Sequence, residues 1–267
     1  MTEFETITVK NDGAVAVLTF ERPQVRNAMN LPMIREIKRA FDEVNQDSSV
    51  RVIVLRGDGK VFCAGGDLNW MRDVIGQTEE EVMEDSRNLL DMYRTINNSP
   101  KLVITAIHGA AIAGGLGIVA CSDVSIAERE TKFCISEVGI GLVPGIIAAY
   151  ILPRIGLSWF RYLAKTAITF DTHTARTAGL IHEVADGEDD LTDRVRKHVN
   201  LGLAASPDAI TKTRDLIKSI DHKSEEEALS NALCFNAKSR LSKEAQEGIS
   251  AFLDRRKPTW FRQTNQP

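Results

Sequence analysis

Residues 102–123, which read LVITAIHGAAIAGGLGIVACSD, decide the fold of this chain. The first half of this stretch is apolar and rich in β-branched residues, glycines interrupt its middle, and the second half is apolar again. This pattern predicts a buried strand, a glycine loop and a buried helix. Residues 102–122 carry no charged side chain, so they also reach the length of a membrane-spanning helix. The four glycines and the central His108 favour the strand, loop and helix.

On either side of this stretch, short apolar runs end at glycine or proline. Such runs predict strands, because strands are short and bounded by turn residues. We expect further strands to begin or lie within residues 14–20, 50–57, 61–68, 123–127, 132–136 and 181–184.

Helices are predicted where a capping residue precedes apolar side chains at helical spacing. Asn30 precedes such a pattern over residues 31–46, and Thr78 with Glu81 forms a capping box that opens a helix to about Asn97. Three further helices are expected near the C-terminus, beginning at Ser206, Ser224 and Ser242. The predicted fold is therefore α/β (α+β), with a core over residues 1–195 and a helical region over residues 196–267.

Composition places the chain among globular proteins. It has 267 residues, of which 43% are hydrophobic and 26% charged, and this excludes a fibre, a coiled coil and a disordered chain. A net charge of −4 provides no basic field for nucleic acid, which is not expected as a partner. The four cysteines form no C-x-x-C pair, so we expect free thiols and no metal site. The N-terminus shows no signal peptide, and a cytoplasmic location is expected.

Two glycine-rich loops are candidates for binding an oxygen anion. They span residues 63–67 and 109–117, and each follows a predicted strand. Neither has the Gly-Lys-Ser/Thr of a P-loop or the G-x-G-x-x-G spacing of a dinucleotide site. A glycine loop that enters a helix exposes backbone N–H groups, and two such groups that converge form an oxyanion hole. The alternative is that both loops are tight turns needed for packing.

Glu137 is the candidate acid or base. It precedes residues 138–153, which carry no charge. A carboxylate among apolar residues is costly to bury, so its pKa is expected to rise toward the range of a general acid or base. The alternative is a surface turn.

Four ordered motifs, namely RPQVRNAMN at 22–30, FCAGGDL at 62–68, GAAIAGGLG at 109–117 and SEVGIGLVPG at 136–145, resemble the crotonase (enoyl-CoA hydratase/isomerase) superfamily. The resemblance implies a spiral of repeated β-β-α units with a C-terminal helical trimerisation region. It also implies acyl-CoA thioester substrates, no further cofactor, and a homotrimer or a dimer of trimers.

Site residues follow from this resemblance by position. Gly66 and Gly114 would donate the two oxyanion N–H groups, and Glu137 would be the catalytic carboxylate. The other residues expected to bind substrate or CoA are Arg26, Ala28, Ala64, Asp67, Leu68, Gly117, Arg256 and Lys257.

The chain departs from the two-glutamate hydratases at Gly117, where they carry their first catalytic glutamate. It also resembles the bacterial 3-methylglutaconyl-CoA and γ-carboxygeranoyl-CoA hydratase branch, which implies hydration of a branched or carboxylated 2-enoyl-CoA in fatty acid metabolism or branched-chain amino acid catabolism. A carboxylated substrate calls for a cation, for which Arg72, Arg154 and Arg161 are candidates. The alternatives are a Δ3,Δ2-enoyl-CoA isomerase with Glu137 as its single base, and a CoA-binding protein without catalysis.

Overall fold

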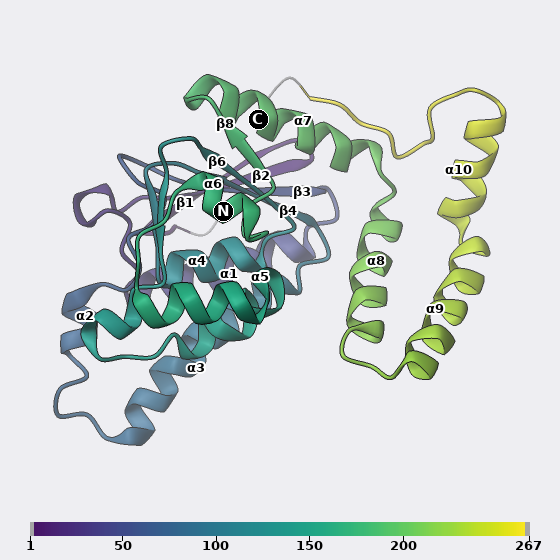
Figure 1. The fold of residues 1–267 in the computed structure, drawn as a ribbon. Helices are drawn as coiled ribbons and strands as arrows, with labels where there is room; N and C mark the ends of the chain where they lie inside the picture. Colours follow the sequence, from purple (N-terminus) through teal and green to yellow (C-terminus); the bar gives the residue numbers. More distant parts are fainter. Residues whose placement is uncertain (1–2, 265–267) are drawn as a thin grey trace.

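The computed structural model describes residues 3–264 and contains a six-stranded sheet with helices on both faces (Figure 1). The strand order is β1-β2-β3-β4-β6-β8; β1 and β2 are antiparallel, and each later neighbour is parallel. The strands are β1 (Ile7–Asp12), β2 (Val15–Phe20), β3 (Val52–Gly57), β4 (Leu102–Ile107), β6 (Val124–Glu128) and β8 (Glu183–Ala185). The α/β fold predicted from the sequence is confirmed.

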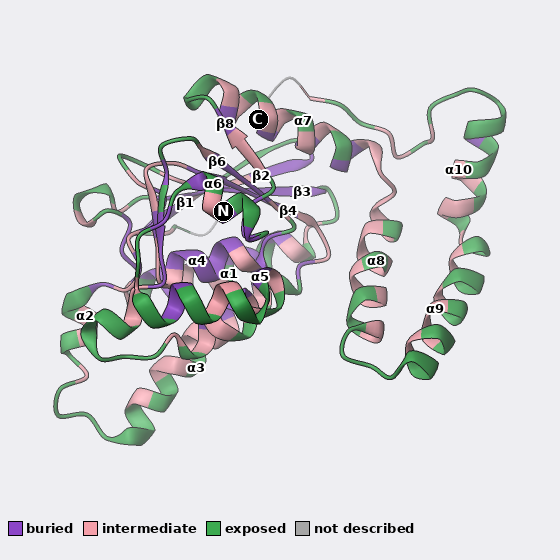
Figure 2. Cartoon of the chain, in the orientation of Figure 1, coloured by how far each residue is buried: buried purple, intermediate pink, exposed green. Residues whose placement is uncertain are grey.

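The central strands read as continuous apolar runs because both faces of the sheet are buried. In β3, Ile53 and Leu55 pack into a core with α1 (Leu31–Gln46) and α3 (Glu79–Asn97). Val52 and Val54 point to the opposite face and pack against α7 (Glu188–Ala204). Figure 2 shows the buried residues concentrated in the sheet and in the helices that contact it.

Residues 102–122 form a strand, a short second strand and a helix. After β4, β5 (Ala110–Ile112) pairs in parallel with β7 (Lys132–Cys134), and α4 (Gly114–Cys121) follows at once. The predicted strand, glycine loop and helix are therefore confirmed, with β5 added inside the loop. Within residues 3–264 no helix is long and apolar enough to cross a membrane.

The predicted helix caps are confirmed. The Asn30 side chain accepts from the Met33 amide, and Thr78 forms both bonds of its capping box with Glu81. Ser206, Ser224 and Ser242 cap α8 (Pro207–Ile220), α9 (Glu225–Arg240) and α10 (Lys243–Leu253). The other helices are η1 (Pro23–Val25), α2 (Leu68–Arg72), η2 (Glu137–Ile140), α5 (Gly145–Thr166) and α6 (Thr172–Thr177).

The strand expected at the start of residues 61–68 is reduced to two isolated bridges, Cys63 with Ala111 and Gly66 with Met29. The chain turns away at Gly65, whose φ of +95° is a left-handed conformation that favours glycine, and it then enters α2. The prediction of a strand there was wrong, because the turn at the glycines ends the extended conformation before a strand can form.

The last three helices lie away from the sheet (Figure 1). Large apolar side chains on and beside them are exposed, including Ile217, Leu229, Leu233, Leu241, Ile249, Phe252 and Leu253. The expected division between residues 195 and 196 lies inside α7, whose apolar side packs on the sheet up to Leu203. After α10 the chain returns to α7, where the Trp260 indole N–H donates to the Ala204 carbonyl at 3.1 Å.

Candidate active site

The two glycine loops lie side by side in the structure. The Cys63 amide donates to the Ala110 carbonyl at 3.1 Å, and the Ile112 amide donates to the Cys63 carbonyl at 3.0 Å. Gly65 sits so close to the second loop that a Cβ on it would lie 3.1 Å from the Ala113 Cβ. Loops that are 46 residues apart in sequence (Cys63 to Gly109) therefore converge, as the oxyanion hypothesis requires.

Each loop presents one backbone amide that is free to bind a ligand. Among the hydrogen bonds of residues 3–264, neither the Gly66 N–H nor the Gly114 N–H has an acceptor. Gly114 is the first residue of α4, so its amide also lies at the positive end of a helix dipole. The turn before it is unusual, because Ala113 has φ 46° and ψ −115°. The Ala113 amide is held by the Cys134 carbonyl at 2.8 Å.

An ion pair fixes the first loop. The carboxylate of Asp67 lies 3.0 Å from the guanidinium of Arg22, and both side chains are largely buried. Asp67 also caps α2 by accepting from the Asn69 amide at 3.0 Å. Burial raises the pKa of Asp67, but the Asn69 amide and the hydrogen bond and charge of Arg22 outweigh it and lower the pKa. Asp67, expected to bind substrate, thus has its carboxylate committed to holding the Gly66 loop.

The residues expected along the CoA path come together beside this loop. The Ala64 amide donates to the Arg26 carbonyl at 3.0 Å, and the Met29 amide to the Gly65 carbonyl at 2.7 Å. Ala28 is buried, whereas the Arg26 side chain is exposed. Leu68, the first residue of α2, is 72% exposed, so it offers an apolar surface next to Gly66.

Glu137 begins η2, three residues after the carbonyl of Cys134 that holds Ala113. The β5–β7 pairing ends three residues before Glu137, and the charge of Glu137 acts on Tyr93, whose hydroxyl donates to the Gly114 carbonyl at the start of α4. Its Oε2 atom is buried and has no hydrogen-bond partner. Burial raises the pKa of Glu137, although the backbone amides of Glu137 and Ser136 lower it in part. The expected rise in pKa is confirmed in direction, and the site holds an unpartnered carboxylate oxygen.

The chain is similar to many known proteins. The profile of the enoyl-CoA hydratase/isomerase family matches residues 10–263. The chain belongs to the enoyl-CoA hydratase/isomerase family. It is 31% identical to the crotonyl-CoA hydratase of Syntrophomonas wolfei, over 97% of this chain and 98% of that protein. It is 29% identical to the peroxisomal Delta(3,5)-Delta(2,4)-dienoyl-CoA isomerase of Arabidopsis thaliana, over 95% of each chain.

The crystal structure of an enoyl-CoA hydratase from Shewanella pealeana has the same fold, with a TM-score of 0.93, 31% identity and 97% of each chain covered. These similarities make the protein an enzyme of the enoyl-CoA hydratase/isomerase family, consistent with an acyl-CoA substrate. Within residues 3–264 no group of His, Cys, Asp and Glu could hold a metal ion.

In this member of the family, the space beside Gly117 is filled by Tyr93, a residue that the sequence analysis missed. A Cβ on Gly117 would lie 2.7 Å from two ring atoms of Tyr93 and 2.8 Å from the Cγ2 of Ile147. No side chain fits at this position, and Gly117 presents none to a ligand. The available signal was a tyrosine within the apolar stripe of α3, since a buried hydroxyl needs a partner.

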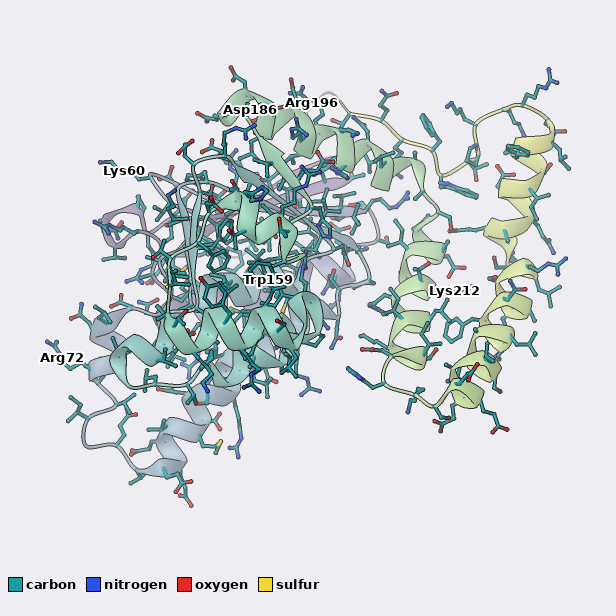
Figure 3. All side chains as sticks on the ribbon, in the orientation of Figure 1. Lys60, Arg72, Trp159, Asp186, Arg196 and Lys212 are labelled. Atoms are coloured by element: carbon teal, nitrogen blue, oxygen red, sulfur yellow. The ribbon has the colours of Figure 1, made fainter. Side chains whose placement is uncertain are left out.

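The guanidinium of Arg154 forms hydrogen bonds with backbone carbonyls of the protein. It donates to the Val119, Ala120 and Ser122 carbonyls at 2.7 to 3.0 Å, so it caps the C-terminal end of α4. Burial lowers the pKa of Arg154 to about 10. Of the three arginines considered for a substrate carboxylate, Arg72 and Arg161 remain exposed, and Figure 3 shows Arg72 extending outward at α2.

Arg256 and Lys257 follow α10, on the opposite side of the molecule from α2 (Figure 1). Arg256 pairs with Glu247 at 2.7 Å, and the ammonium of Lys257 lies 4.4 Å from the ring centre of Phe261. A single chain therefore does not bring these two residues to the glycine loops.

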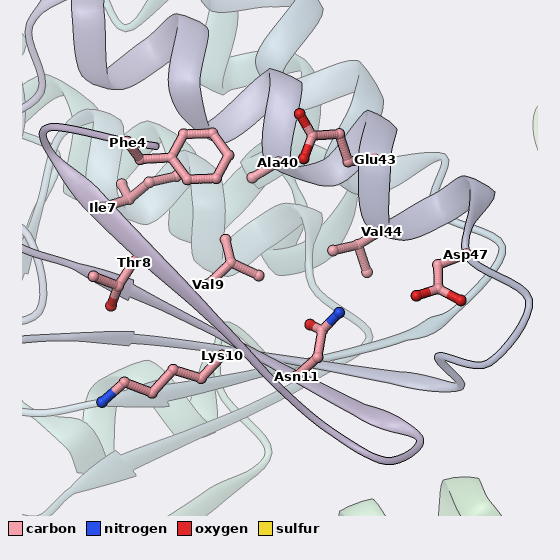
Figure 4. A pocket seen from close by; sticks show the side chains of 10 residues that line it. All are labelled: Phe4, Ile7, Thr8, Val9, Lys10, Asn11, Ala40, Glu43, Val44 and Asp47. Carbon is pink, nitrogen blue, oxygen red and sulfur yellow. The ribbon is translucent and has the colours of Figure 1, made fainter. Parts of the chain in front are cut away.

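Neither the Cys63 thiol nor the cavity between β1 and α1 adds chemistry to the site. Cys63 is fully buried, and burial raises the pKa of its thiol to about 12, which suits packing and not nucleophilic attack. A cavity of about 420 Å³ lies between β1 and α1 and contains none of the site residues (Figure 4). The site is therefore defined by the two glycine loops and Glu137.

Proposed function

We propose that the protein catalyses the reversible hydration of a 2-enoyl-CoA. The observation that carries this proposal is the unpartnered, buried Oε2 of Glu137, together with two backbone amides that lack acceptors in the converging glycine loops. The amides of Gly66 and Gly114 bind the thioester oxygen and stabilise the negative charge that it gains. Removal of one such donor typically lowers kcat by a factor of about 10² to 10³.

Glu137 moves the protons of the reaction. Its carboxylate accepts a proton from water as the water oxygen bonds to C3, and the electrons of the double bond move onto the thioester as an enolate. The carboxyl group then returns the proton to C2, which regenerates the thioester and the carboxylate. A single base that serves both steps fits a site in which Gly117 presents no second carboxylate.

We further propose that the acyl group is branched or carboxylated. The similarity to the 3-methylglutaconyl-CoA hydratase branch in the glycine loops supports this choice. Arg72, which extends outward from the helix that follows Gly66, remains available for a substrate carboxylate (Figure 3).

Double-bond isomerisation is the second candidate. It is favoured by the same single carboxylate, because transfer of a proton between C2 and C4 needs one base and one oxyanion hole. Water has no part in that reaction, so the two functions differ in the atoms that they add to the product.

The deciding experiment uses 3-methylglutaconyl-CoA in deuterated water, with intact-mass analysis of the product. Addition of D₂O with deuterium at C2 supports the hydratase, whereas exchange without addition supports the isomerase. No change with this thioester, with crotonyl-CoA or with a 3-enoyl-CoA would contradict both. Glu137→Gln should lose turnover, and Glu130→Gln, an exposed carboxylate in the preceding turn, is the matched control.

We also propose that the protein assembles as a homotrimer or a dimer of trimers. The exposed apolar side chains of α8, α9 and α10 support this assembly, since a large apolar surface on a monomer marks an interaction site. Light scattering coupled to size exclusion measures the mass directly. A monomer at micromolar concentration would contradict the proposal.

A further inference from the structure

Tyr93 connects the C-terminal part of α3 to the first residue of α4. Its side chain is fully buried, and its hydroxyl donates to the Gly114 carbonyl at 2.8 Å. Its ring lies against Gly117 on one side and packs with Tyr150 at a centroid distance of 5.8 Å. One side chain thus touches both ends of the segment Gly114–Gly117, which begins with a free amide.

Gly114 needs an external support. It has no side chain of its own to pack, and it follows a strained turn at Ala113. Its amide must point toward a ligand without help from an intrahelical partner, because the first amides of a helix have none. A hydrogen bond on the Gly114 carbonyl restricts the backbone rotation of the same residue, and this holds the direction of its N–H.

The hydroxyl of Tyr93 keeps its proton over the whole working pH range. Burial raises the pKa of Tyr93 well above its ordinary value, and the nearby charge of Glu137 adds to this effect. The group is therefore a permanent donor to Gly114, and it contributes no titration of its own to the reaction.

We propose that Tyr93 is a positioning residue that preorganises the Gly114 amide for the thioester oxygen. This inference rests on the proposed function, in which that amide is one of the two oxyanion donors. Preorganised donors matter because a donor that must reorient during the reaction loses much of its advantage. Tyr93 thereby provides a fixed oxyanion hole in a chain whose Gly117 offers no side chain to support the same loop.

The test is Tyr93→Phe, which removes the hydroxyl and keeps the ring against Gly117. Tyr150→Phe is the matched control, because it makes the same change on the neighbouring ring. The readout is the absorption maximum of a donor-substituted cinnamoyl-CoA bound at the site, since hydrogen bonds to its thioester oxygen polarise the chromophore and shift its absorption to the red. The shift requires binding alone, so it can be measured without turnover.

We expect the red shift to shrink in Tyr93→Phe and to persist in Tyr150→Phe. With the substrate that the deuterated-water experiment identifies, kcat should fall by about 10- to 100-fold in Tyr93→Phe, with little change in KM. This decrease is smaller than the one expected for loss of a whole oxyanion donor. An unchanged red shift and kcat in Tyr93→Phe would overturn the inference. Equal losses in both variants, accompanied by a matching fall in Tm, would also overturn it, because they would indicate general loosening of the core.

A second variant tests the same contact from the other side. In Gly114→Ala the amide remains, but the new Cβ would lie 3.0 Å from the Tyr93 hydroxyl and would also meet the Met29 Cε. The methionine end is flexible, whereas the Tyr93 ring is packed against Gly117 and Tyr150. The new Cβ should therefore push the Gly114 backbone away from the hydroxyl, and the red shift should again shrink. A full shift in this variant would contradict the inference. Absence of any shift in the unaltered protein would contradict the oxyanion assignment itself, and so separates failure of the proposed function from failure of the Tyr93 role.

Discussion

Replacement of Glu137 by glutamine should make the protein more stable while it inactivates the enzyme. The structure leaves Oε2 of this carboxylate buried without a partner, and burial raises its pKa. An unsatisfied buried polar group costs about 1–3 kcal/mol, more when it is charged. A neutral amide of the same shape recovers part of that cost, so we expect a gain of about 1 kcal/mol at pH 7.5.

The gain should depend on pH in a defined direction. Because the pKa of Glu137 is higher in the folded than in the unfolded state, the folded protein binds this proton more tightly. The cost of the carboxylate is therefore fully present above the folded pKa, and it disappears as the pH falls to the unfolded value of about 4.3. The advantage of Glu137→Gln should vanish over the same interval.

Thermal unfolding at fixed protein concentration measures this effect, because association also shifts Tm. A gain of about 1 kcal/mol corresponds to a rise of about 2–4 °C for a chain of this size. Turnover should fall by a factor of about 10² to 10⁴. Glu130→Gln should change neither quantity. Lower stability of Glu137→Gln at pH 7.5, or a stability difference that does not vary with pH, would refute the reasoning.

Substitutions at Gly66, Asp67 and Gly117 test the loops further. Gly66→Pro removes the N–H that we propose as an oxyanion donor, so kcat should fall by about 10²- to 10³-fold. Gly66→Ala, whose Cβ would meet the flexible side chain of Met71 at 3.1 Å, should remain active. Asp67→Asn leaves the largely buried Arg22 guanidinium without its counter-charge, so the free energy of unfolding should fall by about 3 kcal/mol in urea titrations, and by less when Arg22→Gln is also present. Gly117→Ala forces a Cβ against Tyr93 and should cost about 1–3 kcal/mol; an unchanged Tm would contradict the packing described above.

Local signals in the sequence predicted most of the secondary structure and the components of the candidate site. The caps at Asn30 and Thr78 and the apolar runs of β3 and β4 act over a few residues, and the structure has them where they were predicted. Glycine spacing marked both loops, and the uncharged stretch after Glu137 indicated a carboxyl group with a raised pKa. These features depend on backbone geometry and on the cost of burying charge, which can be read from neighbouring residues.

The tertiary structure alone decided which side chains support those loops. Tyr93 reaches Gly114 across 21 residues, Arg154 reaches Ser122 across 32, and Arg22 reaches Asp67 across 45. No local pattern specifies such partners, because they are chosen by the packing of helices and strands that are distant in the chain. The same packing placed Arg256 far from the loops and filled the space beside Gly117. The sequence therefore predicted the candidate groups of the site, and the fold determined how they are held.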